Sequence, residues 1–323
     1  MKLPKYYICP MSKNIVDVII ELNSDEFGLL PSRRQIDYDG GYVNNWNTEN
    51  FYRYVKNKNS VVIERDHGGH SQGSINDNGY ESFKNDSRYM NIIHIDPWKY
   101  TNDLKTGIEE TIKYLKFIYD YNPEVKFEIG TEESIRKFNE VEIIEIIETI
   151  KNQVNKEIFD NIEYVVIQSG VGLDIYNRVN IGNFDLNRLK NMIEVGRFYN
   201  KKTKEHNGDY LSIEEIKIRF EKGLDAINIG PEIAQIETMT YIENMSQDQI
   251  DKFYKLCVDS KKWQKWTNKN FDINNKLNVI LTCGHYLFSH GDFIKLKNKL
   301  RININSLIKE NLSNKMKELI TII

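Results

Sequence analysis

A carboxylate and an imidazole stand side by side at the end of an apolar run in the segment Val61-Val-Ile-Glu-Arg-Asp66-His67-Gly-Gly-His70. Imidazole nitrogen is a common ligand of divalent metals, and a neighbouring carboxylate can take up and return a proton during catalysis. The two glycines that follow let the backbone approach a ligand closely. We therefore predict a chemical role for Asp66 and His67, with a simple hydrogen-bonded pair as the structural alternative.

Several other short apolar runs also end in polar residues. The strands expected on this pattern cover residues 6–10, 91–96, 126–132, 164–170 and 225–231, with weaker signals at 28–31 and 203–206. Helical spacing of apolar residues lies between them, at 106–121, 140–154, 186–198 and 213–222. This alternation predicts an α/β fold, a closed (β/α)8 TIM barrel whose strand ends carry the chemistry. An open doubly wound sheet is the alternative, but the glycine-rich phosphate turn typical of that fold is missing.

The size and composition of the chain agree with an enzyme-like barrel and an appendage. The 323 residues carry a formal net charge of −3 with acidic and basic residues interspersed, which argues against a nucleic-acid partner. Three cysteines without paired spacing indicate a reducing compartment. No apolar run approaches the roughly 20 residues that cross a bilayer, so we expect a cytoplasmic protein without a membrane partner.

A change of pattern near Cys257 suggests a domain boundary. The sequence predicts one helix over residues 232–256, then a polar stretch, then a second apolar run at 277–283. We assign residues 1–257 to the barrel and residues 258–323 to a mainly helical C-terminal extension that packs on it. Within the extension, residues 293–300 and 304–320 have amphipathic spacing.

Strand-end motifs along most of the chain carry a family resemblance. They are Asp66-His67-x-Gly69, Ile93-His94-Ile-Asp96, Ile129-Gly130-Thr131-Glu132, Gln168-x-Gly170-Val171-x-x-Asp174, His206-x-x-Asp209-Tyr210 and Ile229-Gly230-Pro231, with Gln35, Gly40-Gly41-Tyr42 and Tyr286-x-x-x-His290 in addition. In this order they resemble the tagatose-bisphosphate aldolase subunit family of the GatZ/KbaZ type. That family is in turn similar to the class II ketose-bisphosphate aldolases, which are metal-dependent barrels.

The resemblance implies a divalent metal, zinc first and manganese second. His67 and His206 match the first and third histidine ligands of the class II aldolases, whereas Gln168-Ser169-Gly170 stands where their sixth-strand histidine would be. We predict Glu132 as the third ligand. The alternatives are Gln168, His70 and the tail histidines His285 and His290. Structural alternatives also exist for His206, as an anchor of the following loop, and for Glu132, as a helix cap.

The resemblance also suggests the roles of other residues. Among the catalytic residues we place Asp66 as general acid/base, Asp96 as a residue that orients a ligand or a loop amide, and Asn228 as a substrate contact. For substrate binding we predict Gln35, Gln168, Asp209, Gly230 and Arg34. Gly230 precedes a helix that offers N–H groups to a phosphate, although Gly-Pro also simply starts a helix. Arg34 matches no arginine of the family; it suits a phosphate or carboxylate, with an ordinary surface charge as the alternative. Gln168 could orient a substrate hydroxyl or instead bond the barrel rim. His94 is expected to point toward the helices as a satisfied, partly buried histidine.

Three functions remain open from the sequence. The first is a metal-assisted aldolase that cleaves a ketose phosphate such as tagatose 1,6-bisphosphate, and the second is a metal-dependent ketose or ketose-phosphate 4-epimerase at the same site. The third is a non-catalytic subunit that stabilises a class II aldolase partner. Loss of the sixth-strand histidine favours the third, while the many strand-end polar groups oppose it. A homo-oligomer is expected on base rates alone.

Overall fold

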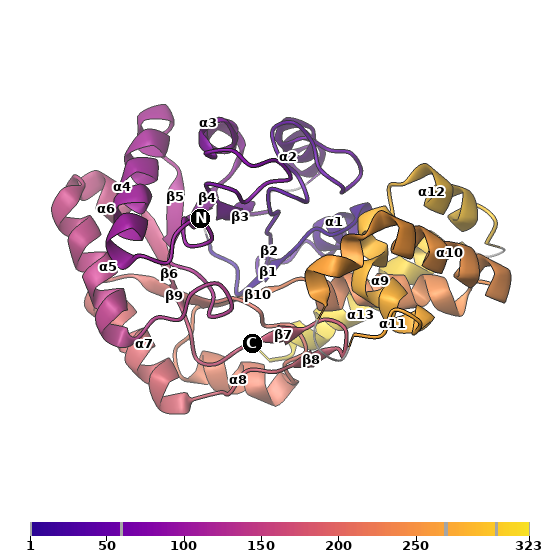
Figure 1. Ribbon diagram of the computed structural model, residues 1–323. Helices are drawn as coiled ribbons and strands as arrows, with labels where there is room; N and C mark the ends of the chain where they lie inside the picture. Colours follow the sequence, from indigo (N-terminus) through magenta and orange to yellow (C-terminus); the bar gives the residue numbers. More distant parts are fainter. Residues whose placement is uncertain (1, 59–60, 268–270, 301–302, 323) are drawn as a thin grey trace.

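Eight parallel strands form a nearly closed barrel in the computed structural model, which describes residues 2–58, 61–267, 271–300 and 303–322 (Figure 1). The strands follow the order β2-β1-β10-β9-β6-β5-β4-β3. Their bounds are β1 Tyr6–Ile8, β2 Phe27–Leu29, β3 Glu64–Gly68, β4 Ile92–Ile95, β5 Lys126–Ile129, β6 Ile162–Ile167, β9 Lys202–Glu205 and β10 Ala226–Ile229. Parallel bridges from Leu29 to Ile63 and from Ser32 to Asp66 close the ring between β2 and β3. The predicted (β/α)8 barrel with a helical extension is confirmed.

Amphipathic helices follow the strands and cover the outside of the barrel. They are α1 Lys13–Leu22, α2 Thr48–Lys56, α3 Tyr80–Tyr89, α4 Leu104–Tyr121, α5 Glu140–Gln153, α6 Lys156–Asp160, α7 Leu186–Phe198, α8 Ile213–Glu221 and α9 Pro231–Glu243. Side-chain caps fix where several begin: Asn139 and Ser212 form reciprocal capping boxes with Glu142 and Glu215. A short antiparallel hairpin, β7 Leu173–Asp174 and β8 Val179–Asn180, interrupts the connection from β6 to α7 and was not predicted.

The interior of the barrel is partly ionic. Lys204 on β9 donates hydrogen bonds to Glu64 on β3 (2.7 Å) and to Glu128 on β5 (2.6 Å), and all three side chains are fully buried. These strands are not neighbours in the sheet, so the contacts cross the inside of the barrel. The Lys204 ammonium also lies 3.8 Å from the centre of the Tyr7 ring. Buried charges are stable only when paired, and this cluster therefore ties three strands together just below the strand ends.

The C-terminal extension lies to one side of the barrel and then returns to it (Figure 1). Helix α10 Gln247–Ser260 leads into it, and its elements are η1 Lys262–Trp266, α11 Lys276–Cys283, η2 Gly284–Leu287, α12 Gly291–Lys297 and α13 Ile304–Ile320, so the helical tail is confirmed. The last helix, α13, packs against α9 and α1, and the Tyr6 hydroxyl on β1 donates to the Leu319 carbonyl (3.0 Å). Among the described residues, no helix is both long enough and apolar enough to span a bilayer.

The expected single helix over residues 232–256 was wrong. The chain forms two helices, because α9 ends at Glu243 and Ser246 starts α10 with a capping box to Gln249. A residue whose side chain caps backbone N–H groups favours a new helix start over continuation. As a result α10 runs without interruption across positions 257 and 258, where the sequence suggested a boundary.

Candidate active site

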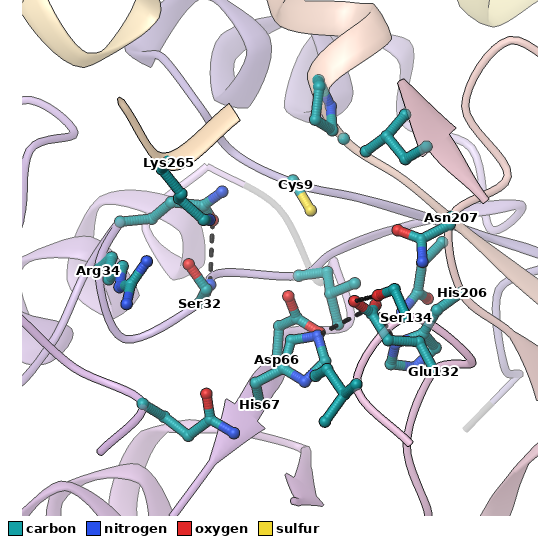
Figure 2. Close-up of a pocket in the computed structure, with 18 of the residues that line it drawn as sticks. Cys9, Ser32, Arg34, Asp66, His67, Glu132, Ser134, His206, Asn207 and Lys265 are labelled. Atoms are coloured by element: carbon teal, nitrogen blue, oxygen red, sulfur yellow. Dashed lines mark hydrogen bonds and ion pairs between the residues drawn. The ribbon is translucent and has the colours of Figure 1, made fainter. Parts of the chain in front are cut away.

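A cavity of about 650 Å³ is lined by residues that follow the carboxyl ends of the barrel strands (Figure 2). Asp66 and His67 come from β3, Glu132 follows β5, and His206 follows β9. The extension adds part of the wall from η1 and η2. Enzymes with this fold place their chemistry at this end of the barrel, so the cavity is the candidate active site.

A break in β3 brings two consecutive side chains into the cavity. Along a regular strand Asp66 and His67 would face opposite sides, but the pairing with β4 shifts register between Arg65 and Gly68. His67 has a φ of 45°, in the left-handed region that residues with a Cβ rarely adopt. Backbone strain of this kind collects at functional sites, where the surrounding structure holds it in place.

Buried carboxylates orient the two predicted histidine ligands. His67 Nδ1 lies 2.5 Å from Asp96 Oδ2, and His206 Nε2 lies 2.6 Å from Glu128 Oε1. Each contact assigns a ring N–H to the nitrogen that faces the carboxylate and turns the other nitrogen of the ring toward the cavity. This is the arrangement typical of metal-bound histidines, in which an outer carboxylate fixes the tautomer. Asp96 thus has the orienting position predicted for it, and its side chain does not line the cavity.

The two ring nitrogens that face the cavity converge on Glu132. Its Oε2 atom lies 3.5 Å from His67 Nε2 and 3.7 Å from His206 Nδ1. Burial disfavours the carboxylate, but hydrogen bonds with His206 and His67 hold the pKa of Glu132 well below its usual range. Burial likewise opposes a charged His206, yet the bond to Glu128 raises the pKa of the ring to about 9. Two imidazoles and a carboxylate form a donor set that suits zinc, and manganese after it.

Two buried oxygen atoms in the same cavity have no hydrogen-bond partner. They are Asp66 Oδ1, which lies 3.5 Å from His67 Nε2, and Asn228 Oδ1 on β10. A buried polar atom without a partner is costly, and such atoms in a functional cavity indicate a missing ligand. The unpartnered atoms therefore agree with a cation and a substrate that Asp66 and Asn228 would contact. The donor types of Asp66, His67 and His206 suit a divalent metal, and Glu132 faces both rings.

His94 lies inside the barrel, so the expectation that it points toward the helices was wrong. Its ring centre is 5.1 Å from that of His67 and 5.0 Å from that of His206. Residues two apart on a strand share a face, and Asp96, which faces the site, should have indicated this orientation. Asp66, His67, His94 and His206 have nitrogen and oxygen atoms close enough to hold an ion together.

Hydrogen bonds nevertheless occupy both nitrogens of His94. Nδ1 accepts from the His67 backbone N–H (3.2 Å), and Nε2 lies 3.0 Å from the Gly130 carbonyl, to which it donates. Burial lowers the pKa of His94, which agrees with a neutral ring. His94 is thus a satisfied histidine, as expected, and it supports the backbone at His67.

The amide group of Gln168 forms its hydrogen bonds with the barrel rim. It donates to the carbonyls of Thr131 and Arg136 (both 2.8 Å) and accepts from the Phe138 N–H (2.9 Å). It does not line the cavity. The structure therefore matches the rim-bonding alternative for Gln168 and leaves no free group for substrate or metal.

Asp209 blocks the phosphate position predicted at Gly230. Its Oδ1 atom accepts from the backbone N–H groups of Gly230 (2.9 Å) and Glu232 (2.8 Å), at the start of α9. Burial raises the pKa of Asp209 to about 7. Both residues line the cavity, but the N–H groups offered to a phosphate are already bonded. An anion must therefore bind elsewhere in the cavity.

Two adjacent arginines in the loop after β2 have different surroundings. Arg33 is buried and bonded to Asp37 (2.8 Å) and Asp77 (2.7 Å), so its role is structural. Arg34 lines the cavity, as does Gln35, which accepts from the Ser32 N–H (3.0 Å). The placement of Arg34 and Gln35 agrees with substrate binding.

The remaining histidines lie outside the cavity wall. His70 bonds Ser71 and stacks on Tyr100, and His290 caps α12 on the surface. His285 is buried beside Tyr42 and Tyr286, both of which do line the cavity. None of the three histidines supplies the third ligand. Among the cavity residues that sequence reasoning missed are two lysines from other segments, Lys99 after β4 and Lys265 in η1.

Comparisons with known proteins show a shared fold. No protein-family model matches the chain, and no curated protein matches it. A probable tagatose 6 phosphate kinase from Sinorhizobium meliloti 1021 superposes with a TM-score of 0.76 at 12% identity, covering 99% of this chain and 100% of the other. Fructuronate-tagaturonate epimerase UxaE from Cohnella laeviribosi gives 0.64 at 9% identity, covering 98% and 82%. The YdjI aldolase from Escherichia coli K12 gives 0.54 at 13% identity, covering 98% and 92%.

These likenesses establish the fold. At such identities they do not carry activity or substrate over to this chain. Residue roles therefore rest on the geometry of the cavity.

Proposed function

We propose that this protein is a metal-assisted sugar-phosphate aldolase that reversibly cleaves a ketose phosphate such as tagatose 1,6-bisphosphate. The observation that carries the proposal is the convergence of His67 Nε2 and His206 Nδ1 on Glu132 Oε2, beside a buried Asp66 oxygen without a partner. Zinc is the expected ion and manganese the second choice. The resemblance to the GatZ/KbaZ-type family and the aldolase among the fold neighbours point the same way.

The residues divide the chemistry between them. When bound, a divalent ion supplies Lewis-acid stabilisation of the negative charge that develops as a carbon–carbon bond breaks. Asp66 takes the proton from the C4 hydroxyl, C4 becomes an aldehyde, and the electron pair of the C3–C4 bond passes to the carbonyl side as an enediolate. Asn228, whose Oδ1 atom is free, orients a substrate hydroxyl. Asp96 and Glu128 hold the two imidazoles in their ligand tautomers.

A 4-epimerase is the second candidate. The observation that favours it is the fold shared with fructuronate-tagaturonate epimerase UxaE at a TM-score of 0.64. The same Asp66 would remove the proton, and the cleaved or deprotonated intermediate would be rejoined or reprotonated on its other face. The two activities differ in product and not in the residues they need.

A third possibility is a supporting subunit for a class II aldolase. In a purely structural chain, buried and unpartnered oxygens such as Asp66 Oδ1 and Asn228 Oδ1 would lower stability and serve no function. This cost argues for a ligand in the cavity and ranks the supporting role below the two catalytic ones.

Metal content and product analysis on one preparation test the proposal. We expect one zinc or manganese per chain, and triose phosphate released from a panel of ketose phosphates. His67→Ala is expected to lose the metal, and Asp66→Asn to keep it while turnover falls by roughly 10²- to 10⁴-fold. His290→Ala is the matched control, because that histidine caps α12 on the surface.

Each result points to one reading. Metal with interconversion of C4 epimers and no net cleavage would establish the epimerase. Absence of metal, with turnover only after a class II aldolase is added, would make the chain a supporting subunit. Full activity in both Asp66→Asn and His67→Ala would refute the assigned site.

A further inference from the structure

Three cationic side chains line one cavity without an acidic partner. Arg34 comes from the loop after β2, Lys99 from the loop after β4, and Lys265 from η1 of the extension. In the part of the chain that the structure describes, none of the three forms an ion pair, whereas the adjacent Arg33 is paired with two aspartates. Arg34 and Lys99 make contacts with backbone carbonyls of Gly73 and Ser71, which leave their charge unneutralised.

The three charges lie close enough to act on one another. Lys265 is exposed to solvent; the atoms packed around it and the charge of Arg34 lower its pKa to about 8, and the carboxylates of Glu132 and Asp66 oppose this shift. Burial and the same arginine lower the pKa of Lys99. Figure 2 shows Arg34 and Lys265 together on one side of the cavity, with Asp66 and His67 between them and His206.

An anion that binds among these three positive charges is attracted by each of them, while the carboxylates of Asp66 and Glu132 lie on the side of the cavity that holds the reacting groups. A guanidinium offers a planar pair of donors to phosphate or carboxylate, and ammonium groups add point charges. The other position in this cavity suited to a phosphate, the start of α9, is already occupied by Asp209. The basic cluster is therefore the place in the cavity where an anionic group gains most.

We propose that Arg34, Lys99 and Lys265 form an anion subsite that binds the phosphate or carboxylate at the non-reacting end of the sugar. The sugar chain would extend from this subsite toward Asp66 and the His67–Glu132–His206 centre. The assignment of the anion to a sugar rests on the proposed function, whereas anion binding itself does not. The C-terminal extension thereby becomes part of substrate recognition, because it supplies Lys265.

Binding of inorganic phosphate tests the subsite directly. Calorimetric titration at constant ionic strength should show phosphate binding to the wild-type protein and a roughly 10- to 100-fold weaker affinity for Lys265→Met and Arg34→Met, since each removes a charge-assisted hydrogen bond. Lys262→Met is the matched control, because this lysine lies in the same short helix and does not line the cavity. It should bind phosphate within twofold of wild type.

Competition distinguishes the two sources of the anion. Fructose 6-phosphate and fructuronate are each titrated into protein that already holds phosphate. The stronger competitor shows whether the natural group is a phosphate or a carboxylate. Both compounds should bind more weakly to Lys265→Met than to the wild type. Zinc content and circular dichroism are measured on every variant. Loss of phosphate binding with zinc retained supports the subsite, and it does so even if turnover is never found. Equal phosphate affinity in Lys265→Met and Lys262→Met, or no phosphate binding by the wild type, overturns it.

Discussion

Hydrogen bonds to buried carboxylates determine which ring nitrogen of His67 and of His206 faces the cavity. Asp96 and Glu128 each accept a ring N–H, which frees His67 Nε2 and His206 Nδ1 for a ligand. His94 has the same neighbours but no such carboxylate bond, and its two nitrogens bond the backbone instead. The three clustered histidines therefore differ: two turn a ring nitrogen toward the cavity, and the third bonds only the backbone, a difference that ring proximity alone would not reveal.

Asp96→Asn tests this division. The amide keeps the size of the side chain but can present its NH₂ group to His67 Nδ1, which favours the wrong tautomer. We expect zinc affinity to fall roughly 10- to 100-fold, as is common when the outer partner of a metal-bound histidine is changed. Competition with a chromogenic chelator measures this affinity.

Thr131→Val is a milder variant to compare with Asp96→Asn. The Thr131 hydroxyl donates to the same Asp96 oxygen (3.1 Å) without touching the ring, so its loss should weaken zinc binding less than Asp96→Asn does. Unchanged affinity in Asp96→Asn would mean that His67 is not a ligand.

The site residues at the strand ends could be predicted from sequence. The charged residues inside the barrel, below the strand ends, were not predicted. Asp66 and Glu132 follow apolar runs, His206 follows one of the weaker strand signals, and the cavity brings the three together. Glu128 and Lys204 were missed because an apolar strand pattern says nothing of polar side chains that pair across the barrel interior. Each stands two positions before a strand-end residue, and this spacing was the available signal, because residues two apart share a face.

At the scale of the elements, β3, β5 and β9 act as one unit through the cluster of Glu64, Glu128 and Lys204. Burial and the nearby Glu128 charge raise the pKa of Glu64, while Lys204 and the histidines outweigh burial and hold the pKa of Glu128 well below its usual range. Glu128 is thus the charged member, paired with Lys204 on one oxygen and with His206 on the other. The ionic core and the site share this carboxylate.

Lys204→Met is predicted to destabilise the fold by about 3–5 kcal/mol, because it leaves a buried carboxylate without its cation. Urea unfolding followed by circular dichroism measures the loss. Lys202→Met is the matched control on the same strand: this lysine points outward and pairs with Glu163 at a half-exposed position, so its loss should cost below about 1 kcal/mol. Equal effects of the two substitutions would contradict a structural role for the interior cluster.

At the scale of the whole molecule, the barrel and the extension share one core. Helix α10 crosses the boundary suggested by the sequence, and α13 returns to pack between α1 and α9 (Figure 1). The amphipathic spacing of residues 304–320 predicted this helix but not its position, because a sequence pattern gives the apolar face of a helix and not the surface that it covers. Lys265 reaches the cavity only because the extension is held in place.

We therefore expect barrel and extension to unfold in a single transition. Leu312 lies fully buried on α13, and Leu312→Ala should cost about 2–5 kcal/mol through lost burial and the cavity that remains. Because α13 contacts β1 through Tyr6 and Leu319, the loss should lower the unfolding midpoint of the barrel as well as that of the extension. Tryptophan fluorescence and circular dichroism during urea unfolding should shift together, while Lys317→Ala on the exposed face of α13 should leave the midpoint nearly unchanged. Two separate transitions, of which only the smaller responds to Leu312→Ala, would instead establish the extension as an independent domain.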